Sequence, residues 1–540
     1  LADGINKDFY FLEVNTRLQV EHPITEETTS IDIVEWMIRQ AFDSDFTIAN
    51  YQYIAQGHSI EVRLYAEDPT RNFIPSVGTL TKVKFPDYPW ARFDFGFETG
   101  SDVTSHYDPM LGKIIVFGYT RRQAISRMKK ILAEFEVSGL STNLSYLQEI
   151  ISNDDFVENK ISTEFLNSFD CQLPSLEVLK SGFFTTIQDY PGRSGFWSIG
   201  VPPSGPVDNL AFRTANAIVG NEDFGTSGIE ITLEGPSLKF HADAIIALTG
   251  AKMKADIDGK EVGWYQRIYV KAGNVLNIGS VIDKGFRSYL AIKDGFNLPD
   301  YLGSKSTFCF GKFGGLNGSP LKIGDNVPFH NQTSSEYEEI SLANEFIPQY
   351  QNNWEIGVIY GPHGSPDFFK EKSIEMFFNT KWKVHHNSNR LGIRLIGPKP
   401  EWTRKDGGEA GLHPSNIHDC EYAIGTINFT GDMPIILNCD GPSLGGFVCP
   451  ATIIQSEFWK LGQISANDTV EFKRVSYEYA LISKKQQYEF LENIFYKQLE
   501  NKKENIQTSI KVKEDLLISG NKSMSWINRN CTWSSQIYIS

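Results

Sequence analysis

The sequence predicts a multidomain α+β protein, and three observations support this prediction. The chain has 540 residues, more than the roughly 250 to 300 over which one hydrophobic core usually grows. Residues 1–169 mix helical and strand-like hydrophobic patterns. Residues 176–472 instead consist of β-branched runs interrupted by turns such as PPSGP and FGGLNGSP. We therefore expect about two to four domains, with a β-rich second part.

Composition and charge exclude several classes of partner. Hydrophobic residues make up 41% and charged residues 22%, which is typical of a globular protein. The net charge of -15, with no compensating run of Lys or Arg, would repel nucleic acid and anionic membranes. No apolar run approaches the about 20 residues of a membrane helix. The six cysteines form no CxxC pair, so we expect reduced thiols and a cytoplasmic protein.

In the first part of the chain, hydrophobic periodicity predicts a series of short elements. Residues 9–20 alternate polar and apolar side chains like a strand, and IDIVEWMIRQAF (31–42) has the spacing of an amphipathic helix. Strand-like runs follow in SIEVRLYA, GTLTKVKF and KIIVFGY. A helix is predicted over 121–135, with one apolar stripe made of Ala124, Ile125, Met128, Ile131 and Leu132. We place domain boundaries at residues 56 and 169.

The second part of the chain is expected to form two β-rich lobes, 176–329 and 340–475. Two internal echoes suggest the division, because IGDNVPF resembles ANDTVEF and EGPSL resembles DGPSL. Common turn chemistry is the alternative explanation for such short matches. The polar stretch HNQTSSEYEE would connect the lobes, and residues 476–540 are expected to form an exposed helix or linker and a tail.

The stretch LEVNTRLQVEH carries the first group of candidate site residues. Its period of two places Glu13, Asn15, Arg17, Gln19 and Glu21 on one face. A solvated edge strand is the alternative, but the preceding FYF run favours burial, where such groups need a cation or a substrate. Carboxylate and amide oxygens suit Mg²⁺, an arginine suits an oxyanion, and a glutamate can act as a general base.

The motifs FYFLEVNTRLQVEHPITEE, GHSIEVRLYAEDP, NFIPSVGTL and SHYDPMLGKII resemble biotin carboxylases of the ATP-grasp superfamily. The resemblance implies the end of an ATP-grasp domain over 1–56, a biotin carboxylase C-terminal domain over 57–169, and ATP with Mg²⁺ as cofactors. The implied site residues are Glu13 and Asn15 for Mg²⁺, Arg17, Gln19 and Val20 around bicarbonate, Glu21 as the base, and Arg92 beside the biotin enolate. The family's phosphate loop and nucleotide-binding lysines would lie upstream of Leu1. We therefore expect this chain alone neither to bind ATP tightly nor to carboxylate biotin.

The β-rich part offers a second group of candidates, in which carboxamides and charged residues lie beside glycines. Gln188 ends a strand-like run, Arg390 lies in SNRLGIRLIGP, Asn428 lies in GTINFTGDMP and Asp440 lies in NCDGPSLGGF. Glycines let the backbone approach a ligand closely. For each residue alone, a structural role in a turn or at a strand end is the alternative. The histidine spacings match no strong zinc site.

The stretches FFTTIQDYPGRSGFWSIGVPPSGPVDNLAFRTANAIVGN and RKDGGEAGLHPSNIHDCEYAIGTINFTGDMPIILNCDGPSLGGFVCPATI resemble the allophanate hydrolase subunit 2 family. This family includes the carboxyltransferase domain of urea carboxylases, which implies a two-lobed, cyclophilin-like barrel fold. A biotin carboxylase segment followed by this domain is the urea carboxylase arrangement. The resemblance implies ATP- and bicarbonate-dependent carboxylation of biotin, followed by transfer to urea to give allophanate. Asp440 would bind the urea N–H groups, with Gln188, Arg390 and Asn428 nearby.

The resemblance also defines partners and alternatives. The expected partners are urea, bicarbonate and a biotin carrier domain, because no biotinylation motif follows residue 472. The sequence leaves self-association into a homo-oligomer open. One alternative is a subunit of a 5-oxoprolinase-type enzyme, and another is a noncatalytic binding or regulatory fragment.

Overall fold

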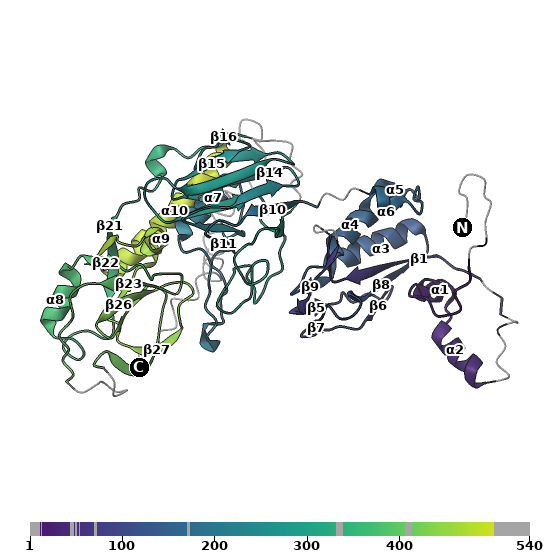
Figure 1. Cartoon of the computed structure of the whole chain (residues 1–540), viewed down its shortest axis with the longest axis horizontal. Helices are drawn as coiled ribbons and strands as arrows, with labels where there is room; N and C mark the ends of the chain where they lie inside the picture. The colour runs from purple at the N-terminus through teal and green to yellow at the C-terminus, as the bar shows by residue number, and fades with distance from the viewer. Residues whose placement is uncertain are drawn as a thin grey trace, which may run out of the picture.

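The structure is a computed structural model of the chain. It describes residues 11, 13–43, 48, 51–52, 54–69, 73–169, 173–330, 338–405 and 413–501, with side chains of 168 and 495–501 left aside. Figure 1 shows a smaller N-terminal part, in purple and blue, and a larger part built of two β-rich lobes. The predicted connector 330–339 and the C-terminal tail fall largely outside the described residues.

The predicted strand over residues 9–20 is not a strand in its described residues. Residues 13–20 form no regular element, and Phe11 is 83% exposed, while residues 9, 10 and 12 lie outside the described part. Alternation alone cannot make a strand, because its backbone groups need a neighbouring strand. No strand within the described ranges pairs with 13–20. Two helices follow, α1 (His22–Thr29), which was not predicted, and α2 (Ile33–Phe42), which was.

The core of the N-terminal part is a three-stranded antiparallel sheet in the order β1 (His58–Tyr65), β8 (Met110–Gly118), β6 (Ala91–Phe95). One face packs on α3 (Arg121–Glu134), whose predicted stripe is entirely buried. The other face lies under α1. The remaining elements are β2 (Glu67–Asp68), β3 (Ile74–Pro75), β4 (Gly78–Thr79), β5 (Lys82–Lys84), β7 (Asp102–Val103), β9 (Glu136–Ser138), α4 (Leu144–Ser152), α5 (Asp154–Val157) and α6 (Phe165–Ser168).

The first lobe consists of two antiparallel sheets that enclose one apolar core. A six-stranded sheet contains β16 (Lys260–Glu261), β15 (Met253–Ile257), β18 (Val275–Val281), β13 (Ser237–Phe240), β10 (Ser175–Lys180) and β20 (Asn326–Pro328), in that order. A five-stranded sheet contains β11 (Phe184–Gln188), β12 (Gly228–Thr232), β19 (Arg287–Ile292), β14 (Ala244–Gly250) and β17 (Arg267–Val270). Helix α7 (Asn209–Val219) packs on β14 and β19 of the second sheet.

The second lobe is a closed barrel. Its strands follow the order β21 (Asn353–Tyr360), β28 (Ala451–Ile453), β25 (Thr426–Thr430), β26 (Met433–Leu437), β23 (Gly392–Ile396), β22 (Trp382–Val384) and β29 (Thr469–Arg474). Large aromatic residues fill the interior, including Trp354, Trp382 and Phe472. A two-stranded ribbon, β24 (Asn416–Glu421) and β27 (Leu444–Phe447), and the helices α8 (Glu371–Asn379) and α9 (Phe458–Gln463) complete the lobe.

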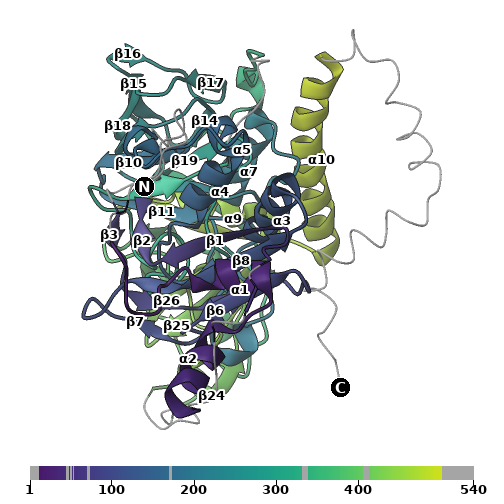
Figure 2. The ribbon, with the colours of Figure 1, turned by 90° about the vertical axis from the view of Figure 1, so that its right-hand side faces the viewer.

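The C-terminal helix α10 (Tyr477–Asn501) packs against α7 of the first lobe and against the short 3-10 helix η5 (Gln455–Glu457) of the second. Leu491 is fully buried, and the guanidinium of Arg213 on α7 lies 4.4 Å from the ring centroid of Tyr488. Figure 2 shows this helix lying lengthwise along the larger part. The prediction of an exposed helix or linker was therefore right about the helix and incomplete about its packing. Of the helices described, none is long and apolar enough to cross a membrane.

Candidate functional site

The charged face of the N-terminal sheet holds part of the first predicted site. Lys113 on β8 donates to the carbonyl oxygen of Val20 at 2.9 Å. Arg63 on β1 pairs with Glu21, with Nη2 and Oε2 2.9 Å apart. The structure thus brings Val20 and Glu21 onto the sheet, just before α1 begins.

Arg92 lies on the same face of the sheet and is held by two carboxylates. Its Nε and Nη2 atoms donate to the two carboxylate oxygens of Asp94 at 2.8 and 3.1 Å. Its Nη1 atom donates to Glu26 of α1 at 2.6 Å. The hydrogen bond to Asp94, followed by that to Glu26, raises the pKa of Arg92. The guanidinium is therefore a fixed cation on the side of the sheet that α1 covers.

The other predicted residues of this site are not assembled. Glu13, Asn15 and Arg17 are exposed on the irregular segment, and Gln19 is half-buried. Within the described part of the chain, no three His, Cys, Asp or Glu side chains are grouped so that they could hold a metal ion. Glu13 and Asn15 as placed here therefore do not fit a Mg²⁺ site on their own.

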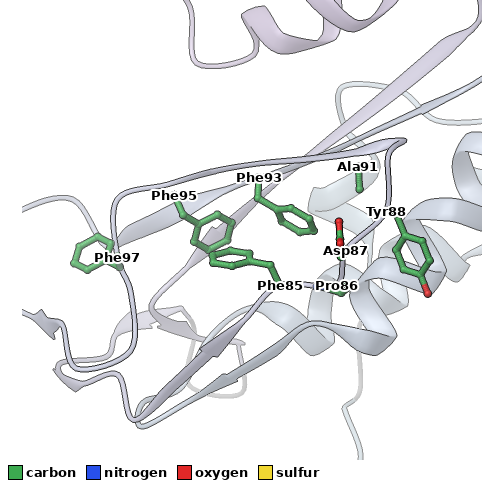
Figure 3. Close-up of a pocket in the computed structure, with 8 residues that line it drawn as sticks. All are labelled: Phe85, Pro86, Asp87, Tyr88, Ala91, Phe93, Phe95 and Phe97. Atoms are coloured by element: carbon green, nitrogen blue, oxygen red, sulfur yellow. The ribbon is translucent and has the colours of Figure 1, made fainter.

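An open pocket of about 460 Å³ lies on the opposite face of β6 from Arg92. Figure 3 shows its lining, which is aromatic except for one carboxylate and small side chains. Phe93 and Phe95 alternate along the strand with Arg92 and Asp94, so they point to the core face. The lining contains a single carboxylate and no cation. This pocket therefore does not provide the charged groups that the predicted carboxylation site needs.

The second predicted site lies where the first lobe meets the barrel. On the face of the five-stranded sheet turned away from the apolar core, Thr186 is paired with Glu230, and Glu230 with Tyr289, across β11, β12 and β19. Gln188 lies on the same face of β11, two residues after Thr186. Because partners in antiparallel strands point to the same side, these side chains form one polar row. All four are buried.

Arg390 of the second lobe reaches this row and connects three groups. Its Nη1 atom donates to Oε1 of Glu230 at 2.6 Å. Its Nε and Nη2 atoms hold both oxygens of Asp440 at 2.7 and 3.1 Å. Nη2 also donates to the carbonyl oxygen of Gly205 at 2.8 Å. Two of the predicted site residues, Arg390 and Asp440, are thus in direct, bidentate contact, and Glu230 from the first lobe completes the cluster.

A second connection between the lobes runs through Gln463 of α9. Its amide nitrogen donates to Asp208 at 2.7 Å and to the carbonyl oxygen of Arg287 at 2.9 Å. Its amide oxygen accepts from the backbone nitrogen of Arg287 at 3.2 Å. Asp208 also caps α7, accepting from the backbone nitrogen of Ala211 at 2.8 Å. The polar groups on both sides of the boundary are therefore largely satisfied by each other.

Burial and ion pairing shift the pKa values of the carboxyl groups in this cluster in opposite directions. Burial alone would raise the pKa of Glu230, but the charges of Arg390 and Arg287 outweigh it and lower that pKa. Within the described part of the chain no ion pair joins Asp208 to a cation, and burial raises its pKa to about 7. Burial likewise raises the pKa of the Cys439 thiol to about 12. Glu230 is therefore held as a carboxylate, whereas Asp208 changes charge near neutral pH.

Several buried polar atoms near this cluster have no hydrogen-bond partner in the described structure. They are Gln188 Oε1, Arg193 Nη1, Ser204 Oγ and Asn438 Nδ2. The chain links them closely, because the backbone of Ser204 donates to the carbonyl of Cys439, and Gln188 and Arg193 donate to the carbonyls of Thr307 and Ser306. Buried polar groups normally have partners, so these donors and acceptors suit a small polar ligand.

Asn428 is not part of the cluster. It lies on β25 and pairs across the barrel sheet with Ile435. Its amide oxygen accepts from the thiol of Cys449, with the two atoms 2.8 Å apart. Among the contacts of the described residues, none joins Asn428 to Arg390 or Asp440.

Sequence reasoning missed Glu230, Arg193, Arg287 and Gln463. Glu230 had a usable signal, because a single carboxylate inside the apolar run GIEIT must find a cation or donors if that strand is buried. The sequence carried no such signal for Gln463, because a glutamine at the end of a short helix is usually solvated.

Three protein families match successive stretches of the chain. The family model described as "Carboxyltransferase domain, subdomain A and B" matches residues 199–474, more than half of the chain. "Biotin carboxylase C-terminal domain" matches residues 61–168. "Carbamoyl-phosphate synthase L chain, ATP binding domain" matches residues 1–48.

Similar proteins cover most of this chain. The urea amidolyase of Saccharomyces cerevisiae is 51% identical over 483 residues, which are 88% of this chain and 26% of that protein. The crystal structure of the K. lactis urea amidolyase matches with a TM-score of 0.86 and 48% identity over 91% of this chain and 30% of that chain. The Kluyveromyces lactis urea carboxylase matches with a TM-score of 0.85 and 49% identity, covering 91% of this chain and 44% of that chain.

This chain therefore spans about a quarter of the length of the curated urea amidolyases it matches. Its family assignment rests on residues 199–474, which contain Glu230, Arg390 and Asp440. The protein belongs to the family of the carboxyltransferase domain with subdomains A and B, and its relatives over most of its length are urea amidolyases and urea carboxylases.

Proposed function

We propose that the chain takes part in the biotin-dependent carboxylation of urea, in which ATP and bicarbonate supply the carboxyl group and allophanate is the product. The observation that carries this proposal is the buried cluster of Arg390, Asp440 and Glu230 beside unsatisfied polar atoms, inside the residues that match the carboxyltransferase family. The names of the relatives support urea as the acceptor.

In the carboxyltransferase part, Asp440 is the proposed acceptor of the urea N–H groups. Each of its oxygens accepts one hydrogen bond from Arg390, and a carboxylate offers about four lone-pair sites. The two hydrogen bonds from Arg390 fix the plane of the carboxylate. Two lone-pair sites therefore remain for the N–H groups of a planar urea.

The unsatisfied atoms complete the proposed binding site. Gln188 Oε1 can accept from an N–H group, and Asn438 Nδ2 can donate to a carbonyl oxygen. Biotin, when attached to its carrier domain, supplies a ureido nitrogen that carries the carboxyl group. The buried setting excludes water, which strengthens each polar contact and protects the transferred group.

The N-terminal part supplies proposed residues for biotin carboxylation. By resemblance, Glu21 is the base, Arg17, Gln19 and Val20 surround bicarbonate, and Arg92 steadies biotin; Val20, Glu21 and Arg92 are the three that the charged sheet face holds. The groups that would hold ATP and Mg²⁺ are not assembled among the described residues, so we assign no step to them. A cytoplasmic setting belongs to this proposal and is supported by the cysteines in the described part of the chain, Cys309, Cys420, Cys439 and Cys449, which are free thiols.

The transfer half-reaction tests the proposal directly. The purified chain is given a carboxylated biotin carrier domain and urea, and allophanate is measured by mass spectrometry. We expect urea-dependent product, and we expect Asp440→Asn to reduce it at least about tenfold, since one urea contact of roughly 1.4 kcal/mol corresponds to that factor. Asp243→Asn, at an exposed position of the first lobe, is the matched control.

Three outcomes would count against parts of the proposal. Full activity of Asp440→Asn would remove Asp440 from its role. Transfer to 5-oxoproline in preference to urea would reassign the acceptor. No transfer by the folded chain would show that these residues do not form a working site by themselves, as expected for a noncatalytic fragment.

A further inference from the structure

We propose that Lys113 is a positioning residue for biotin carboxylation, because it ties the bicarbonate segment and the biotin-facing arginine to one place on the N-terminal sheet. This inference rests on the proposed function of that part of the chain. It concerns a residue of the sheet that contacts the proposed substrate-binding residues and to which the resemblance assigns no role.

The position of Lys113 in the sheet is central. Arg63, Lys113 and Asp94 are directly opposite one another on β1, β8 and β6. Opposite residues in antiparallel strands share a face, so the three form one charged row. The next row, on the other face, carries Val62, Ile114 and Phe93 into the apolar core. The charged row therefore stands on a rigid base.

Each member of the row contacts a different piece of the proposed site. Lys113 donates to the carbonyl oxygen of Val20 at 2.9 Å and pairs with Asp94 at 3.2 Å. Asp94 in turn chelates Arg92. One ammonium group thus links the backbone of Val20, through a single carboxylate, to the guanidinium of Arg92.

These contacts differ in how deeply they are buried, and therefore in how much they are expected to contribute to stability. The side chain of Lys113 is 10% exposed, whereas the side chains of Arg63 and Glu21 are 40% and 52% exposed. Exposed ion pairs contribute little, while breaking a buried pair leaves an uncompensated charge. Replacing Lys113 is therefore expected to disturb the site more than breaking the exposed pair of Arg63 and Glu21.

The geometry explains why a lysine is needed here. The ammonium has three donors on a flexible stem, so it can serve a backbone carbonyl and a carboxylate at once. A methionine of similar length would fill the space but remove the donor to the carbonyl of Val20. Asp94 would keep its hydrogen bonds from Arg92 and lose its ion pair with Lys113. The segment before α1 would then lose its fixed distance from Arg92.

Hydrogen exchange of this chain gives the first test. We expect Lys113→Met to speed amide exchange across residues 18–26 at least tenfold, with exchange in α3 unchanged. Lys129→Met, at an exposed position on α3, should leave both regions as in the parent. Lys113→Arg, which keeps the charge, should restore part of the protection. Unchanged exchange over residues 18–26 in Lys113→Met would overturn the inference.

The second test uses the complete carboxylase that contains these residues, with free biotin as acceptor. Lys113→Met should raise the KM for bicarbonate at least tenfold, while transfer from a carboxylated carrier to urea stays at the parental rate. An unchanged KM together with unchanged exchange would refute the positioning role. If the parent enzyme itself fails to carboxylate biotin, the proposed function fails, and the exchange experiment still decides whether Lys113 tethers the segment.

Discussion

Arg390 and Glu230 belong to different lobes, and their side chains meet at 2.6 Å between Nη1 and Oε1. Both are buried, and Arg390 holds Asp440 with the rest of its guanidinium. The proposed urea-binding carboxylate is therefore oriented by an arginine that is itself anchored in the other lobe. This relationship makes the site sensitive to changes on either side of the boundary.

Glu230→Gln should destabilise the carboxyltransferase part by about 3 to 5 kcal/mol, because it leaves two buried guanidinium groups without their shared carboxylate. Calorimetric unfolding measures the change. Glu234→Gln is the matched control, because Glu234 lies just after the same strand and its carboxylate forms an exposed ion pair with Lys180. We expect the control to change stability by less than about 1 kcal/mol, and equal effects would contradict the prediction.

Arg390→Lys should reduce transfer to urea at least about tenfold with little change in the overall fold. Lysine keeps the charge but cannot hold both oxygens of Asp440 and reach Glu230 as well. The half-reaction with a carboxylated carrier measures the loss. Arg474→Lys, at an exposed position on β29, provides the same substitution away from the cluster. Equal rates for the two variants would show that the bidentate contact does not matter.

Asp208 should make stability fall as pH rises through neutrality. Burial raises its folded-state pKa to about 7, whereas an unfolded aspartate has a pKa near 3.9. The folded state therefore binds the extra proton between these values, and the free energy of unfolding decreases with pH until about pH 7. From pH 5 to 8, the stability difference between the parent and Asp208→Asn should shift by about 2 to 3 kcal/mol in favour of the variant. Parallel pH profiles of the thermal midpoint would disprove this assignment.

Leu491→Ala should loosen the packing of α10 on the rest of the protein. The side chain is fully buried, and truncating a buried leucine costs about 2 to 5 kcal/mol. Faster amide exchange in α10, and limited proteolysis within it, would report the loss. Leu481→Ala is the control on the same helix, because Leu481 is 49% exposed. If both variants exchange alike, the packing of α10 is not fixed by Leu491.

Much of the fold could be predicted from hydrophobic periodicity. The helix with Ala124, Ile125 and Met128 on one face is buried along that face, and the β-rich second part contains a closed barrel. The prediction of a strand over residues 9–20 was wrong in the described residues for a physical reason. Alternation reports which side chains share a face, but a strand also needs a hydrogen-bonded neighbour, which the described residues do not provide.

Only some members of the candidate site could be named from the sequence, and their contacts could not. Arg390 and Asp440 were recognised beside glycines, and the structure joins them directly. Glu230 lies 160 positions from Arg390, and nothing local in the sequence connects them. Asn428 differs from these residues, because its amide oxygen accepts from the thiol of Cys449 and no contact of the described residues joins it to Arg390 or Asp440, so its role stays a prediction.

The junction between the lobes also constrains how such proteins can be recombined. Glu230, Asp208 and Arg287 come from one lobe, and Arg390 and Gln463 come from the other. A hybrid that takes each lobe from a different relative inherits half of this set from each parent. It will assemble only when the halves match in charge and length, so the two lobes are compatible as a pair and are expected to diverge together.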